Sequence, residues 1–250
     1  MKKVTFELDG IEYKIPQILT IENYVKIYKV KDLFDEEYFL PRLINILTDA
    51  PMDLLLKAER DKIQMLNKPL MDIFPSDKPV FLDRFELDGV QYGFLPSWKK
   101  MSFGEFADLD TLMTKKPEEM LDFIHIITAI MYRPIVKEIS KHKFEIEEYD
   151  FNSTQERAEL FKKKLDVEVS LGGQFFFTQF ARNCFNPTQT SLWEWMKISR
   201  IQIRIAWKMR RQILKLIFKR RSDGISFLTD FQMMILQDMN KLLKEQLQKL

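Results

Sequence analysis

A five-residue phrase that occurs twice is the strongest constraint on how this chain can fold. Phe6-Glu-Leu-Asp-Gly10 and Phe85-Glu-Leu-Asp-Gly89 are identical, and each continues into an alternating stretch that contains a tyrosine and ends at Pro16 or Pro96. Aspartate followed by glycine between alternating apolar residues is a strong signal for a β-hairpin with a two-residue turn. We therefore predict one hairpin over residues 4–15 and a second that begins at Phe85.

A helix is expected after each hairpin, so that hairpin and helix form a duplicated unit. Thr20 can cap a helix that begins at Ile21, and Ser102-Phe-Gly-Glu105 has the pattern of a capping box. The two copies extend over about 4–30 and 84–113 and indicate an internal duplication. Because an isolated hairpin is only marginally stable in water, we expect the two hairpins to pair into one small sheet.

Most of the remaining chain has the pattern of helices, which sets the predicted fold class. We predict a mainly α protein, close to all-α, with a small antiparallel β component (α+β). It is expected to have a globular helical body at 1–185 and a C-terminal basic and amphipathic helical hairpin at 186–250. Within the body, helices are expected over 35–47, 52–74 with a kink or division at Pro69, 120–132 and 153–165, and Gly172-Gly173 is expected to interrupt the pattern.

Residues 197–221 contain ten basic residues and no acidic one. If this stretch is one helix, seven of the ten fall within a sector roughly 100° wide, and apolar side chains occupy the rest of the circumference. A period-two alternation at its start leaves open a strand followed by a shorter helix. The seven residues of this basic stripe are Lys197, Arg200, Arg204, Lys208, Arg211, Lys215 and Lys219.

Like charges on one helix face repel each other, so something negative is expected to offset the basic stripe. The chain's own acidic residues, an acidic protein surface, a nucleic acid backbone and anionic lipid headgroups are all open, and a membrane is the least favoured. A final amphipathic helix is expected to pack on a neighbouring helix or on a helix of a partner. Its apolar face contains Leu228, Phe231, Ile235, Leu242 and Leu247.

The composition argues against the common kinds of catalytic site. The chain has two histidines and one cysteine, and none of the phosphate-binding, dinucleotide-binding or nucleophile-elbow motifs occurs in it. We therefore expect a protein that is not an enzyme and has no metal or cofactor. His125 lies in the apolar run 123–132, where a buried core histidine is the favoured interpretation. That run is too short to cross a bilayer.

Three segments carry a resemblance to a class of viral proteins: Trp98–Asp110, His125–Ile135 and Tyr149–Phe161. Together with the Leu-Asp-Gly hairpins, they resemble small baseplate-hub and tail-assembly, chaperone-like virion proteins of large tailed bacteriophages, over about residues 1–170. The resemblance implies binding to other virion or tail proteins, as a homo- or hetero-oligomer. It also implies a location in the host cytoplasm during assembly, or in the virion. The alternative is a virion protein that binds DNA through residues 197–221.

Arg133 follows an apolar helix and precedes Pro134, which gives it two interpretations. A cation near the C-terminal end of a helix is favourable, and the proline ends the helix. The other interpretation makes Arg133 an anchor for an acidic partner.

Overall fold

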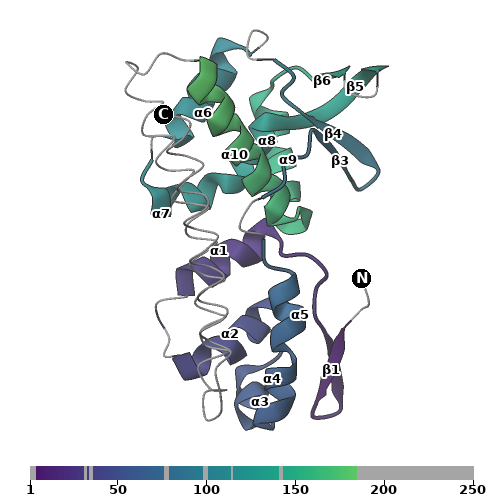
Figure 1. Cartoon of the computed structure of the whole chain (residues 1–250), viewed down its shortest axis with the longest axis vertical. Helices are drawn as coiled ribbons and strands as arrows, with labels where there is room; N and C mark the ends of the chain where they lie inside the picture. The colour runs from purple at the N-terminus through teal and green to yellow at the C-terminus, as the bar shows by residue number, and fades with distance from the viewer. Residues whose placement is uncertain are drawn as a thin grey trace, which may run out of the picture. The chain divides into compact units, whose positions relative to one another are not determined.

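Two antiparallel sheets and a set of helices make up the described part of the chain (Figure 1). The computed structural model describes residues 4–30, 33, 36–75, 79–97, 101–113, 115–140 and 143–184. The predicted boundary at residue 185 and the helical hairpin at 186–250 therefore lie outside the described residues.

Both predicted hairpins are confirmed, and they have the same geometry. Strands β1 (Thr5–Leu8) and β2 (Ile11–Lys14) pair with the register of β3 (Arg84–Leu87) and β4 (Val90–Phe94). In each turn the aspartate and the glycine both have positive φ, at 51° and 76° in the first and 50° and 79° in the second. Positive φ at both central residues defines a type I′ turn, the turn that the Asp-Gly signal predicts.

The predicted single small sheet is wrong, and so is the mainly α, nearly all-α fold class. The first hairpin is a separate two-stranded sheet, whereas the second belongs to a four-stranded sheet of order β3-β4-β5-β6. Strands β5 (Tyr132–Ser140) and β6 (Lys143–Ile146) make the β component substantial. The predicted helix stops at Met131 because the residue before a proline favours extended backbone, so Arg133 and Pro134 belong to a strand.

The helices of the N-terminal part follow the prediction, except that one predicted helix is divided into three. Thr20 accepts a hydrogen bond from Asn23 N at 3.3 Å, as predicted for the cap of α1 (Ile21–Val30). The predicted helix over 52–74 is three short helices, and Pro69 lies inside the third instead of dividing them. The other elements here are α2 (Glu36–Thr48), α3 (Met52–Lys57), α4 (Arg60–Met65) and α5 (Asn67–Asp72).

The remaining helices surround the apolar α8 and approach the larger sheet. They are α6 (Phe103–Met113), α7 (Pro117–Met120), the 3-10 helix η2 (Leu121–Phe123), α8 (Ile124–Met131), α9 (Phe151–Lys164) and α10 (Val167–Cys184). His125 is buried in α8, as predicted. The N-cap of α9 is Asp150, which accepts from Ser153 N, so the helix begins at Phe151, two residues before the predicted start.

The predicted break at Gly172-Gly173 is wrong, because α10 continues through both glycines. A Cβ on Gly172 would lie 2.3 Å from the Val80 carbonyl oxygen, and one on Gly173 would lie 2.6 Å from the Tyr132 ring. The two glycines therefore let a neighbouring backbone segment and a strand side chain approach the helix axis closely.

Aromatic side chains join one face of the four-stranded sheet to α9 and α10. Phe161 of α9 lies with its ring centroid 5.0 Å from Tyr92 and 5.6 Å from Phe85, and Phe176 of α10 lies 5.6 Å from Phe94. Edge-to-face pairs at such distances are favourable in addition to the area that they bury. This aromatic layer is the centre of the core beside the larger sheet.

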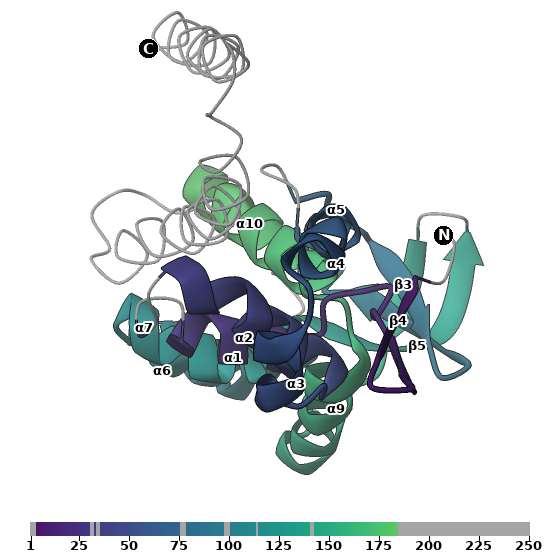
Figure 2. The same ribbon diagram turned by 90° about the horizontal axis from the view of Figure 1, so that it is seen from below.

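Backbone bonds tie the start of α1 to the junction of α9 and α10, and α1 packs beside α2 and α9 (Figures 1 and 2). Ile21 N donates to Leu165 O at 3.3 Å, and Val167 N donates to Leu19 O at 2.8 Å. Residues near the beginning of the described chain are thus held by residues near its end.

Candidate functional site: two hairpins and a buried charge cluster

Of the residues predicted to form a site, only Arg133 is among the described residues. The basic stripe and the apolar face of the final helix lie outside the part of the chain that the structure describes. The candidate site is therefore built from the surroundings of Arg133 and from the two hairpins.

Arg133 lies inside the fold and is paired with a carboxylate. It is the second residue of β5, opposite Gly93 of β4, and its side chain donates from Nη2 to Glu105 Oε1 at 2.8 Å. Arg133 is 4% exposed and Glu105 is 1% exposed. The predicted capping box is confirmed, since Ser102 N donates to Glu105 Oε2 and Glu105 N donates to Ser102 Oγ. The cap therefore also holds the carboxylate that meets Arg133.

Burial opposes the charges of this pair. Burial raises the pKa of Glu105, and the Arg133 charge and the bond from Ser102 act against that rise. Burial likewise lowers the pKa of Arg133, against the effects of Glu105, Glu147 and Tyr149. In both groups the loss of solvation is the largest cause, so each charge depends on its partner for compensation.

A second buried arginine extends this arrangement. Arg157 of α9 donates from Nε to Ala129 O at 3.1 Å, from Nη1 to Glu147 at 3.2 Å and from Nη2 to Thr154 Oγ1 at 3.1 Å. Burial lowers the pKa of Arg157, and the Glu147 charge is the main opposing effect. Tyr149 follows Glu147 by two residues, and its hydroxyl donates to Asp108 of α6. We call Glu105, Asp108, Arg133, Glu147, Tyr149 and Arg157 the charge cluster.

The charge cluster is where the three segments that carry the phage resemblance meet. Glu105 and Asp108 belong to Trp98–Asp110, Arg133 to His125–Ile135, and Tyr149 and Arg157 to Tyr149–Phe161. These segments lie apart in the sequence. The Arg133–Glu105 bond joins β5 to α6, the Tyr149–Asp108 bond joins the residues before α9 to α6, and Arg157 joins α9 to Ala129 of α8 and to Glu147. The three segments thus coincide with contacts that stabilise the fold.

The hairpins have the same internal geometry but different surroundings. Phe6 and Tyr13 stack with ring centroids 5.6 Å apart, and Phe85 and Tyr92 stack at 5.4 Å. The second pair is covered by Phe161 and by Tyr132, whereas the described residues supply no further ring to the first pair. At the tip of the first hairpin Ile11 is 53% exposed.

The cross-strand charges of the two hairpins also differ. In the second hairpin Gln91 donates to its cross-strand partner Glu86 at 2.8 Å. The equivalent residues of the first hairpin are two glutamates, Glu7 and Glu12, which face each other across the strands. Like charges directly opposite each other destabilise a strand pair. The first hairpin therefore keeps an electrostatic cost that the second avoids.

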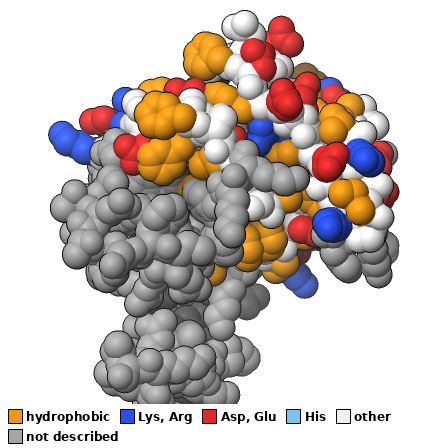
Figure 3. Space-filling model, turned by 90° about the horizontal axis from the view of Figure 1, so that it is seen from above, with side chains coloured by type: hydrophobic (Ala, Val, Ile, Leu, Met, Phe, Trp, Pro, Cys, Tyr) orange, Lys and Arg blue, Asp and Glu red, His pale blue; other side chains and the backbone are white. Residues whose placement is uncertain are grey.

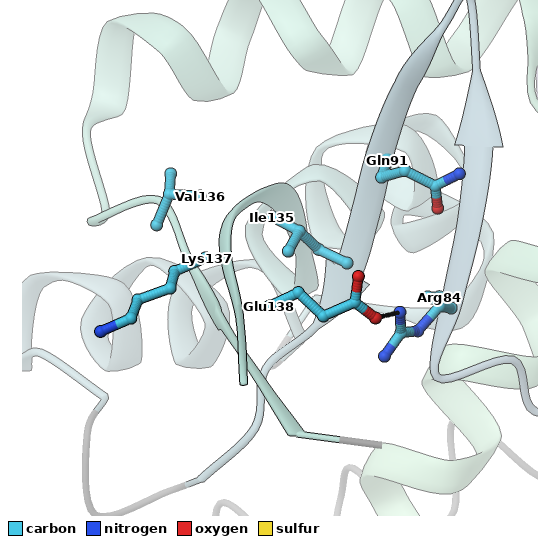
Figure 4. A pocket seen from close by; sticks show the side chains of 6 residues that line it. All are labelled: Arg84, Gln91, Ile135, Val136, Lys137 and Glu138. Carbon is cyan, nitrogen blue, oxygen red and sulfur yellow. Dashed lines mark hydrogen bonds and ion pairs between the residues drawn. The ribbon is translucent and has the colours of Figure 1, made fainter. Parts of the chain in front are cut away.

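A shallow hollow lies on the larger sheet, and side chains of β3, β4 and β5 line it. Its volume is about 500 Å³. Arg84 and Glu138 form an ion pair across it at 2.7 Å, and the Arg84 guanidinium carbon lies 4.9 Å from the centre of the Phe144 ring. The lining contains one further charged residue, Lys137. Figure 4 shows the six lining residues, Arg84, Gln91, Ile135, Val136, Lys137 and Glu138.

Apolar side chains are also exposed at several places on the described surface. Figure 3 shows hydrophobic side chains lying among acidic and basic ones on one face. The largest exposure is that of Phe103, the first residue of α6, at 86%. On this helix Glu105 faces inward to Arg133, so the polar side chain is buried while an aromatic one is left in solvent.

Sequence reasoning missed most of the charge cluster. Glu105 is recognisable only as part of a capping box, and nothing in the spacing of Tyr149 and Arg157 indicates that they approach Asp108 and Glu147. The one available signal was that all of these residues except Glu147 lie within the segments that carry the resemblance.

Comparisons with known proteins add no assignment. No protein-family model matches the chain, and neither the curated proteins nor the solved structures contain a match. Within the described ranges no group of three or more histidine, cysteine, aspartate or glutamate side chains is placed to hold a metal ion. No helix in the same ranges combines the length and apolar character needed to cross a membrane.

Proposed function

We propose that this chain is a non-enzymatic structural or assembly protein of a tailed bacteriophage, which acts through protein–protein contacts in the tail or baseplate. The main observation in support is that the two hairpins, although alike in sequence and geometry, have different strand neighbours. Among the described residues, one hairpin is part of a four-stranded sheet, while its duplicate is a two-stranded sheet whose outer edges pair with no other strand. A strand edge without a neighbour is a template for pairing with another chain.

The resemblance supplies the class of partner. The three segments that resemble tail-assembly and baseplate-hub proteins contribute most of the charge cluster, whose contacts stabilise the fold. The resemblance therefore supports a fold in common with those proteins. The partners are then other virion or tail proteins, met in the host cytoplasm during assembly, with the chain either released as a chaperone or retained in the particle.

Two measurements on an infected culture test this function. Mass spectrometry of purified particles gives the copy number of the chain, and affinity purification from infected cells identifies the proteins bound to it. A small fixed copy number is expected for a structural protein, and binding to a tail component with no copies in the particle is expected for a chaperone. Absence from the particle together with recovery of no virion protein would contradict the proposal.

The second candidate function is binding of nucleic acid through the basic stripe at residues 197–221. It is favoured by ten basic residues without an acidic one in that stretch. Binding through phosphate contacts weakens steeply as salt increases. DNA affinity should therefore fall between low and physiological salt, and it should fall again when Arg204, Lys208 and Arg211 are changed to glutamine. Affinity that neither change alters would eliminate this candidate.

A further inference from the structure

The outer edge of β2 has a pattern of side chains that is complementary to itself. Its residues Ile11, Glu12, Tyr13 and Lys14 alternate between an apolar face and a charged face, and Ile15 follows on the apolar face. In the described residues β2 pairs only with β1, so its other edge carries no strand. We propose that this edge pairs antiparallel with β2 of a second copy of this chain, about a two-fold axis at Tyr13.

The backbone of β2 has the correct alternation for this pairing. Ile15 N donates to Val4 O at 3.0 Å, and residues of an antiparallel strand direct their backbone groups alternately to the two sides. Ile11, Tyr13 and Ile15 therefore point toward β1, while Glu12 and Lys14 point their N–H and C=O groups outward. With Tyr13 on the axis, Glu12 of each copy exchanges backbone hydrogen bonds with the partner's Lys14.

The side chains in this register are matched on both faces. On the charged face, Glu12 lies opposite the partner's Lys14, and the axis repeats the pair. On the apolar face, Tyr13 meets the partner's Tyr13. The exposed Ile11 lies opposite the partner's Ile15, whose side chain is already buried within its own copy. Opposite charges and apolar side chains in cross-strand positions each stabilise a pair of strands. A two-fold interface requires such self-complementarity, since the same patch serves both copies.

Charge explains why a second copy fits this edge better than a strand like β5. In the second hairpin, β4 already accepts β5 on the equivalent edge, and Gly93 lies opposite Arg133. The first hairpin has Lys14 at the position of Gly93, so an arginine opposite would be repelled. A glutamate is favoured there, and β2 supplies one. The same contact gives Glu12 a cation, which offsets its repulsion by Glu7.

The test is the oligomeric state of the full chain, measured by sedimentation velocity over a series of concentrations. The wild type is expected to form a reversible dimer. Glu12→Lys or Lys14→Glu alone places like charges opposite each other at two symmetric positions, and should raise the dissociation constant at least about tenfold. The double exchange Glu12→Lys with Lys14→Glu restores opposite pairs and should restore the wild-type dissociation constant.

A matched pair of proline variants locates the contact on one edge. Glu12→Pro removes an outward N–H from β2 and should weaken the dimer, whereas Glu7→Pro removes the corresponding N–H from the opposite edge, on β1, and should not. Far-ultraviolet circular dichroism checks that both variants remain folded. Because the charge exchange keeps every backbone group, it decides the question even if a proline variant unfolds.

Three results would overturn the inference: a monomer at every concentration, a dimer that the single charge changes leave unaltered, or a double exchange that fails to restore association. This inference concerns self-association and does not depend on the identity of a virion partner. A monomer that still binds a tail protein through its first hairpin would reject the self-pairing and retain the proposed function.

Discussion

Removing either member of the Glu105–Arg133 pair should destabilise the fold far more than removing both. Arg133 is 4% exposed and has a buried Nε without a hydrogen-bond partner among the described residues, so it relies on Glu105 for compensation. Breaking a buried pair by removing one partner costs about 3–5 kcal/mol, whereas replacing both by apolar residues of similar volume is often nearly neutral. We therefore expect Glu105→Leu and Arg133→Met each to lower the free energy of unfolding by about 3–5 kcal/mol.

The assay is equilibrium unfolding in urea at pH 7 for the wild type, both single variants and the double variant. The double variant should lose less stability than either single variant, which requires a coupling free energy larger than about 3 kcal/mol, above the usual range for residues in contact. The matched control is Glu22→Ala, which breaks the exposed pair of Glu22 with Lys26 in α1. An exposed pair of this kind contributes about 0.3–0.5 kcal/mol, and salt screens it.

Two results would refute this reasoning. One is a loss below about 1 kcal/mol for each single variant, which is the scale of an exposed pair. The other is additivity, in which the double variant loses the sum of the single losses. Either result would mean that Arg133 is solvated, and it would return Arg133 to the interpretation in which it anchors an acidic partner.

Three further predictions concern packing, pH and capping. Gly173→Ala should lower the free energy of unfolding, because overpacking against the buried Tyr132 costs about 1–3 kcal/mol and the helix gains at most about 1 kcal/mol. The control is Gly104→Ala in α6, where the added methyl group meets open space and should not destabilise. Equal losses for the two variants in urea unfolding would contradict this prediction. His125→Gln should reduce the loss of stability between pH 7 and pH 5, because burial and then Lys162 lower the His125 pKa, so its contribution is present above its unfolded pKa and lost as pH falls through the folded one; an unchanged pH profile would count against it. Asp150→Ala should lower the melting temperature near neutral pH and lessen the further loss in acid, because bonds from Ser153 lower the Asp150 pKa and its contribution disappears as pH falls through that lowered value; a melting temperature equal to that of the wild type at all pH values would exclude this role.

The parts of the fold that could be predicted are those determined by neighbouring residues. Each Asp-Gly turn depends on two positive φ angles, and the alternation beside it fixes the register, so both hairpins were predicted with their pairing. The caps at Thr20 and Ser102 are likewise local.

Long-range contacts determined what could not be predicted. Pro134 was interpreted as the end of a helix, yet it lies opposite Tyr92 in a strand, because β4 offers an edge that only the folded chain brings near. Gly172 and Gly173 break helices in isolation, but here the helix gains from the close approach of the Val80 backbone and Tyr132. The partners of Arg133 and Arg157 could not be read from spacing for the same reason.

The backbone bonds between the start of α1 and the junction of α9 with α10 have a consequence for synthesis. The ribosome produces Leu19 and Ile21 long before Leu165 and Val167, so the first helix emerges without the groups that hold it. Contacts of such large sequence separation form slowly. The N-terminal hairpin and helices therefore keep part of their apolar surface exposed until most of the described chain has left the exit tunnel. This interval is when a bound chaperone or a partner chain has the most effect on the yield of folded protein.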